Sequence, residues 1–193
     1  MKDHLLGRIL QQDYDGDENP FSEEDRASIK FIKHQIYHHK VVRINYTTYD
    51  GRREQGSLNP HMHANVIVLA HEGPGRHPYW YARIIGIYHA LVIHPSSVDP
   101  IHMDFLWVRW YGSDPDPRYK SGWKARRLPH VGFVADTIDS SPAFGFLDPI
   151  HIIRGVHLIP AFNDGSRSDL LEPSLARLPD EGDFDYSFYY VNM

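Results

Sequence analysis

The sequence predicts an α+β fold that is mostly β: a small, bent antiparallel barrel with an N-terminal helix and a short helix before the closing strand. Two observations predict it. Short runs of β-branched and aromatic residues recur between turn signals over most of the 193 residues. A helix start precedes those runs, and no internal repeat of solenoid length is present. This pattern is typical of a small sandwich or barrel.

The first 40 residues predict helices. Residues 2–10 predict a short helical stretch, and an acidic loop follows at residues 13–20. Ser22 is a suitable N-cap, because Asp25 stands three positions later and acidic side chains favour the positive end of the helix dipole. Isoleucines then recur at helical spacing, so a helix is expected over residues 22–39. The β-branched tail of this segment is equally compatible with an extended chain.

The hydrophobic period changes to that of a strand at residue 41. Residues 41–49 are strand formers, and Asp50-Gly51 is a dipeptide typical of a hairpin turn. The return arm at residues 52–58 is polar and predicts an edge strand. The short apolar run at residues 66–70 predicts a buried strand.

The densest core signal lies in residues 79–88 and 105–111. We expect these segments to be adjacent antiparallel strands at the centre of the fold, because their connection is too short for a buried parallel crossover. Asp148 followed by Pro149 predicts one or two helical turns that end by residue 154. Shorter strands are expected at residues 124–128, 132–134, 156–159 and 184–191.

Composition divides the chain and excludes several classes of protein. We expect an N-terminal acidic loop and helix (1–40), a β-rich core (41–162), a mobile acidic segment (163–183) and a terminal strand that ends as if truncated (184–193). The absence of cysteine excludes disulfides and thiolate chemistry. The apolar runs are far shorter than the ~20 residues that span a bilayer. A net charge of -5 argues against strong non-specific phosphate binding.

Two histidine motifs raise the possibility of a metal enzyme. His61-Met62-His63 places two imidazoles on one side of an extended segment, and His102-Met103-Asp104 fits half of an iron-binding triad. A 2-oxoglutarate oxygenase also needs a distal histidine and an arginine, which follow at His151 or His157 and at Arg154. This oxygenase or hydrolase is the alternative. We favour a chain without catalytic residues, metal or cofactor, and expect the two motifs not to converge.

Aromatic and basic residues predict a binding surface. Strand alternation places Trp107, Arg109 and Tyr111 on one face. Exposed rings of this kind hold a methylated lysine by cation–π attraction or stack a base, and a basic cluster follows after a Pro/Asp/Gly-rich loop. The alternative is that the same rings simply pack the barrel. The predicted surface consists of Trp107, Arg109, Tyr111, Trp123, Lys124, Arg126 and Arg127.

Two family resemblances bear on function. Residues 80–87, 106–111, 127–133 and 152–158 resemble bromo-adjacent homology domains, which are chromatin-associated interaction modules. Distinctive Asn-Tyr-Thr-Thr-Tyr-Asp and Phe-Leu-Asp-Pro runs elsewhere in the chain resemble the C-terminal region of fungal Plavaka-type, CACTA-like transposases. This second resemblance is carried by residues 2–6, 14–18, 43–50, 57–60, 77–83 and 143–149.

The resemblances imply a nuclear interaction module. Plavaka-type proteins carry their catalytic DDE core upstream of this region, so the chain is expected to be an excised or degenerate C-terminal module without transposase catalysis. Its expected partner is a chromatin protein, another part of a transposase complex or nucleic acid. A relict structural domain without a ligand is the further alternative.

Overall fold

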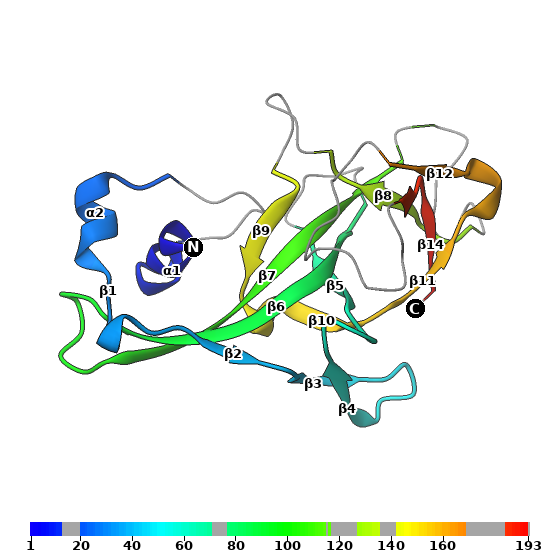
Figure 1. Cartoon of the computed structure of the whole chain (residues 1–193). Helices are drawn as coiled ribbons and strands as arrows, with labels where there is room; N and C mark the ends of the chain where they lie inside the picture. The colour runs from blue at the N-terminus through cyan, green and yellow to red at the C-terminus, as the bar shows by residue number, and fades with distance from the viewer. Residues whose placement is uncertain are drawn as a thin grey trace.

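A long antiparallel hairpin forms the centre of the molecule. The computed structural model describes residues 1–12, 20–70, 77–114, 116, 127–135, 142–168 and 184–192. Strands β6 (Tyr79–Ile93) and β7 (Ile101–Ser113) pair along nearly their whole length and cross the molecule (Figure 1). The prediction of two adjacent, central, antiparallel strands is confirmed. Both strands extend further toward their shared turn than the sequence predicted.

The remaining elements are short. The helices are α1 (Lys2–Ile9) and α2 (Glu23–Ser28), with 3-10 turns η1 (Ile32–His34), η4 (Pro149–His151) and η5 (Phe162–Asp164). The strands are β1 (Lys30–Phe31), β2 (Tyr37–His39), β3 (Val42–Thr47), β4 (Arg53–Leu58), β5 (Asn65–Leu69), β8 (His130–Phe133), β9 (Phe144–Leu147), β10 (Ile152–Gly155), β11 (His157–Pro160), β12 (Ser166–Arg167), β13 (Asp185–Tyr186) and β14 (Tyr189–Asn192).

Most strands add to the central hairpin in one sheet. Its order is β10-β5-β6-β7-β8-β14-β11, while β1 and β2 also pair with β6, and β9 pairs with β7. The hairpins β3–β4 and β12–β13 form separate two-stranded sheets. The fold is therefore α+β and mostly β, as predicted. The expected closure into a barrel is absent from the described strands, because the end strands β10 and β11 do not pair with each other.

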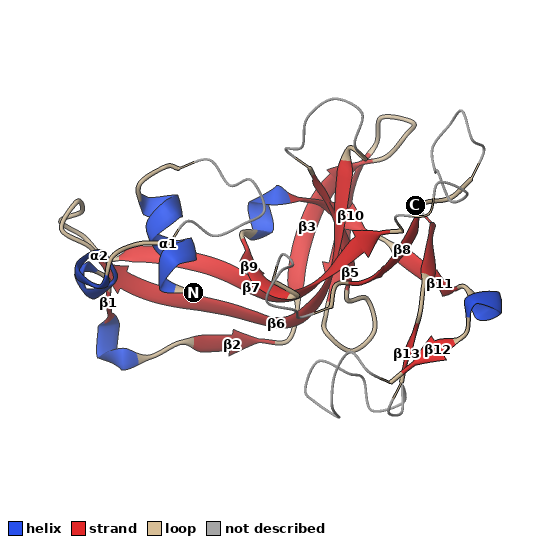
Figure 2. Ribbon diagram, turned by 90° about the horizontal axis from the view of Figure 1, so that it is seen from above, coloured by secondary structure: helices blue, strands red, loops and turns tan. Residues whose placement is uncertain are grey.

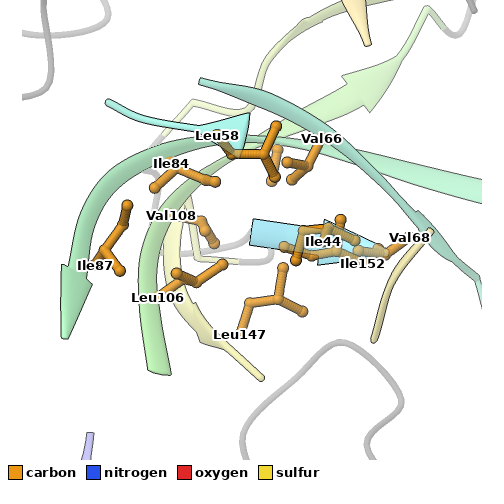
Figure 3. Close-up of a cluster of buried hydrophobic side chains, with 11 residues drawn as sticks. Ile44, Leu58, Val66, Val68, Ile84, Ile87, Leu106, Val108, Leu147 and Ile152 are labelled. Atoms are coloured by element: carbon orange, nitrogen blue, oxygen red, sulfur yellow. The ribbon is translucent and has the colours of Figure 1, made fainter. Parts of the chain in front are cut away.

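The inner half of the hairpin is buried on both faces. One face packs against β5, β10 and the hairpin β3–β4 in an aliphatic cluster (Figure 3). Leu106 and Val108 point into this cluster and Trp110 packs against it, because alternation along β7 turns these three residues to the same face. The opposite face is covered by β8 and β14 through an aromatic cluster that includes Tyr111, Phe133 and Tyr189.

The outer half of the hairpin is covered on one face by the N-terminal segment. Leu5 and Leu6 of α1 are fully buried against Ala90, Val92 and Phe105. Figure 2 shows α1 and α2 on this side of the outer half. The opposite face of the outer half carries histidines that are described below.

The helix expected over residues 22–39 is much shorter in the structure. Ser22 caps α2 in a capping box with Asp25, as predicted, but the helix ends at Ser28. The chain then runs as β1, η1 and β2 along the edge of β6. The extended alternative for the β-branched tail is therefore correct, because pairing with β6 satisfies its backbone groups.

Other boundaries were predicted in part. The short helix α1 and the hairpin turn at Gly51, whose φ is 81°, agree with the sequence. Asp148 accepts a hydrogen bond from the Ile150 amide, yet the helical turn ends at His151 and the chain continues as β10. The strand β9 was not predicted. Among the described residues, no helix is long and apolar enough to cross a membrane.

Candidate functional site

The predicted binding surface is largely interior. Arg109 is 0% exposed and Tyr111 is 5% exposed, while Trp107 is half-buried against Phe144. The expectation that this face of β7 presents rings and a guanidinium to a ligand is therefore wrong for Arg109 and Tyr111. These two side chains belong to the core, as the packing alternative stated.

The C-terminal segment is the cause of this burial. Asp185 of β13 accepts hydrogen bonds from Arg109 at 3.1 Å and 3.4 Å, and both side chains are 1% exposed. The guanidinium also lies 3.5 Å from the centre of the Phe133 ring. A buried charge requires a partner of this kind. The last predicted strand therefore neutralises and covers the arginine that the sequence assigned to a binding surface.

The basic part of the predicted surface is described only at its end. Trp123, Lys124 and Arg126 lie outside the described residues. Arg127 is exposed just before β8. The assignment of these four residues to a binding surface stays a prediction.

The hairpin β3–β4 presents a different exposed polar surface. Its strands pair in regular antiparallel register from Val42–Leu58 to Thr47–Arg53. One face buries Ile44 and Leu58 in the aliphatic cluster, which anchors the hairpin to the body of the protein (Figure 3). Figure 1 shows the hairpin projecting from the side of the molecule. The residues of its other face are all exposed; they are Arg43, Asn45, Thr47, Arg53, Gln55 and Ser57.

The charged groups on this outer face are all positive, and its amides provide both hydrogen-bond donors and acceptors. It carries two guanidinium groups and no carboxylate, because Glu54 lies on the opposite face and accepts a hydrogen bond from Tyr46. The Gln55 amide donates to Asn45 Oδ1 at 3.0 Å. This bond leaves the Asn45 amide nitrogen as a donor and Gln55 Oε1 as an acceptor. The face can therefore donate and accept hydrogen bonds side by side between two positive charges.

A group of possible metal ligands lies on the outer half of the central hairpin. His89, His102 and Asp104 each offer one ligand atom, and these atoms lie within 4.8 Å of one another. This is the one such group within the part of the chain that the structure describes. Burial lowers the pKa of His89 below its ordinary value, and the neighbouring His102 and His39 act in the same direction.

The second histidine motif is not part of this group. His61 and His63 are exposed in the turn after β4, where the backbone amide of His61 donates to Asn59. The sequence therefore identified two members, His102 and Asp104, and missed His89. A strand prediction extended past residue 88 would have placed His89 on β6, but its position opposite Asp104 follows only from the register of β6 and β7.

Comparison with known proteins adds no identification. No family model matches the chain, and no significant match is found to a curated protein or to a solved structure.

Proposed function

We propose that the chain is a non-catalytic interaction module that binds double-stranded DNA through the outer face of the hairpin β3–β4. The observation that carries the proposal is the composition of that face, which is six exposed polar side chains including Arg43 and Arg53. A two-stranded ribbon fits the major groove of B-DNA, which is about 12 Å wide. Proteins that read DNA with strands use such a ribbon.

The side-chain types match the base edges of the major groove. Arginine pairs with the O6 and N7 atoms of guanine, and asparagine or glutamine pairs with the N6 and N7 atoms of adenine. The stretch from Arg43 to Thr47 spans about 14 Å, since a strand rises about 3.4 Å per residue. This length corresponds to about four base pairs. The amide pair Asn45–Gln55 lies in the middle of it.

The charge of the whole chain restricts the mode of binding. A net charge of -5 disfavours binding by phosphate neutralisation alone, so affinity has to come from the positive local surface and from base contacts. A DNA-binding role agrees with the resemblance to a transposase C-terminus and implies a nuclear location. The bromo-adjacent homology resemblance would instead imply a chromatin protein as partner.

The test is fluorescence anisotropy with a labelled 20-base-pair duplex that has been selected for binding from a pool of randomised sequences. We expect Arg53→Ala to weaken binding at least about 5-fold, since a bidentate arginine contact is worth about 1–3 kcal/mol. Lys30→Ala is the matched control, because it removes one exposed positive charge from β1, away from the hairpin. Binding to an RNA duplex should be weaker, because its major groove is too narrow for side chains.

Two results would overturn the proposal. Equal losses for Arg53→Ala and Lys30→Ala would show that binding follows total charge and not the hairpin. Absence of DNA binding, together with binding of histone peptides, would favour the chromatin-protein alternative.

A further inference from the structure

The outer half of the central hairpin has two chemically different faces. Alternation along β6 and β7 turns Ala90, Val92 and Met103 toward α1, where they are buried. The residues between them point the opposite way. On that side the hairpin presents His89 and, farther into solvent, His102 and Asp104, whose side chains are 53% and 60% exposed.

Strand register brings these three side chains together. His89 of β6 lies directly opposite Asp104 of β7, and His102 is two residues earlier on the same face of β7. The rings of His89 and His102 stack with their centres 4.6 Å apart. His102 Nδ1 lies 3.8 Å from Asp104 Oδ2. The pairing of β6 with β7 thus brings the three side chains close together, and their proximity does not depend on the conformation of a loop.

A third histidine from β2 supports this arrangement. His39 Nε2 lies 2.5 Å from His89 Nδ1, a hydrogen bond between two imidazole rings that also stack. The bond occupies Nδ1 of His89 and leaves its Nε2 as the coordinating atom. Histidines that bind metals commonly donate a hydrogen bond from their second ring nitrogen to a carboxylate, a carbonyl or water, which fixes the orientation of the ring. Here the His39 ring takes the place of that acceptor.

The Asp104 carboxylate is available for a ligand. Arg8 of α1 donates to the main-chain carbonyl of Asp104, while its salt bridge goes to Asp148 at 2.6 Å. Arg8 therefore anchors β7 to α1 without occupying the carboxylate. Two imidazoles and one carboxylate then offer ligand atoms within 4.8 Å of one another on the solvent side of the sheet.

We propose that His89, His102 and Asp104 bind a zinc ion, with the fourth position open to solvent. Zinc favours nitrogen and carboxylate ligands in tetrahedral geometry. Bonds of about 2.0–2.1 Å place tetrahedral ligand atoms about 3.4 Å apart. In the structure the three ligand atoms are up to 4.8 Å apart. Rotation of the exposed side chains can bring these atoms to the tetrahedral spacing. The open position can hold a water molecule or a side chain of a partner.

The test is metal titration of the untagged, EDTA-treated chain, with cobalt as the spectroscopic probe and zinc as the competitor. We expect one equivalent of Co²⁺ to bind, with visible absorption bands that Zn²⁺ removes. His102→Ala and Asp104→Asn should each weaken binding at least 10-fold. His39→Ala should weaken it about 10-fold, as is typical for loss of a hydrogen-bonded partner of a ligand. His61→Ala is the control, because this exposed histidine lies outside the group.

Circular dichroism of each variant distinguishes loss of a ligand from loss of the fold. Both ligand substitutions are on an exposed face, so the spectra should match that of the unmodified chain. The proposal is wrong if no stoichiometric binding occurs, or if His61→Ala weakens binding as much as His102→Ala. Its outcome is independent of DNA binding, since none of these residues lies on β3 or β4.

Discussion

Removal of the charge of Asp185 should strongly destabilise the fold. The Asp185 and Arg109 side chains are each 1% exposed, and Asp185→Asn keeps the shape of the carboxylate while leaving the guanidinium without its compensating charge. Breaking a buried ion pair by removing one partner costs about 3–5 kcal/mol. The lower end, about 3 kcal/mol, is expected here, because the Phe133 ring 3.5 Å away still stabilises the cation.

An exposed ion pair in the same chain provides the control. Asp50 and Arg52 are 3.0 Å apart with side chains 55% and 79% exposed, so Asp50→Asn should cost at most about 1 kcal/mol. The assay is urea denaturation followed by tryptophan fluorescence. The double substitution Arg109→Met and Asp185→Leu should recover most of the lost stability, because it removes both buried charges. Equal midpoints for Asp185→Asn and Asp50→Asn would refute the argument that this pair holds the C-terminal segment on β7.

Further predictions concern stability. Burial lowers the pKa of His4 to about 3 from 6.5. As the pH falls, the imidazole of His4 is therefore protonated in the unfolded chain before it is protonated in the folded chain. The contribution of His4 to the free energy of unfolding is complete above pH 6.5 and is lost as the pH decreases toward 3. Between pH 7 and pH 5 the loss is about 2 kcal/mol. In His4→Leu, urea denaturation at the two pH values should lack this component. Gly132→Ala should lower the thermal midpoint, because the added Cβ would lie 2.6 Å from the Ser187 carbonyl oxygen. Gly51→Ala should cost about 1 kcal/mol in denaturant, since its φ of 81° favours glycine.

Local signals predicted the central strands and the β3–β4 hairpin, and they failed where contacts with distant segments determine the structure. The hairpin turn at Gly51 and the strands β6 and β7 follow from turn residues and alternation, which are properties of neighbouring residues. The burial of Arg109 depends on Asp185, which is 76 residues later in the chain. The extended path after Ser28 depends on an available edge of β6. Neither could be read from a local pattern.

The two candidate sites differ in how far a local sequence pattern predicts their residues. The outer face of β3–β4 follows from alternation around the turn, so its residues could be assigned from sequence. The zinc ligands could be assigned only in part, because the His102–Asp104 spacing is local but the contribution of His89 depends on the register between two strands. Register depends on packing of both faces and is not visible in a single segment.

The most direct test of the proposed function is hydrogen exchange measured by mass spectrometry with and without a 20-base-pair DNA duplex. We expect DNA to slow exchange in peptides covering β3 and β4, with little change in peptides of the β6–β7 turn around residues 94–100. Protection confined to other peptides, or unchanged exchange at saturating DNA, would contradict it.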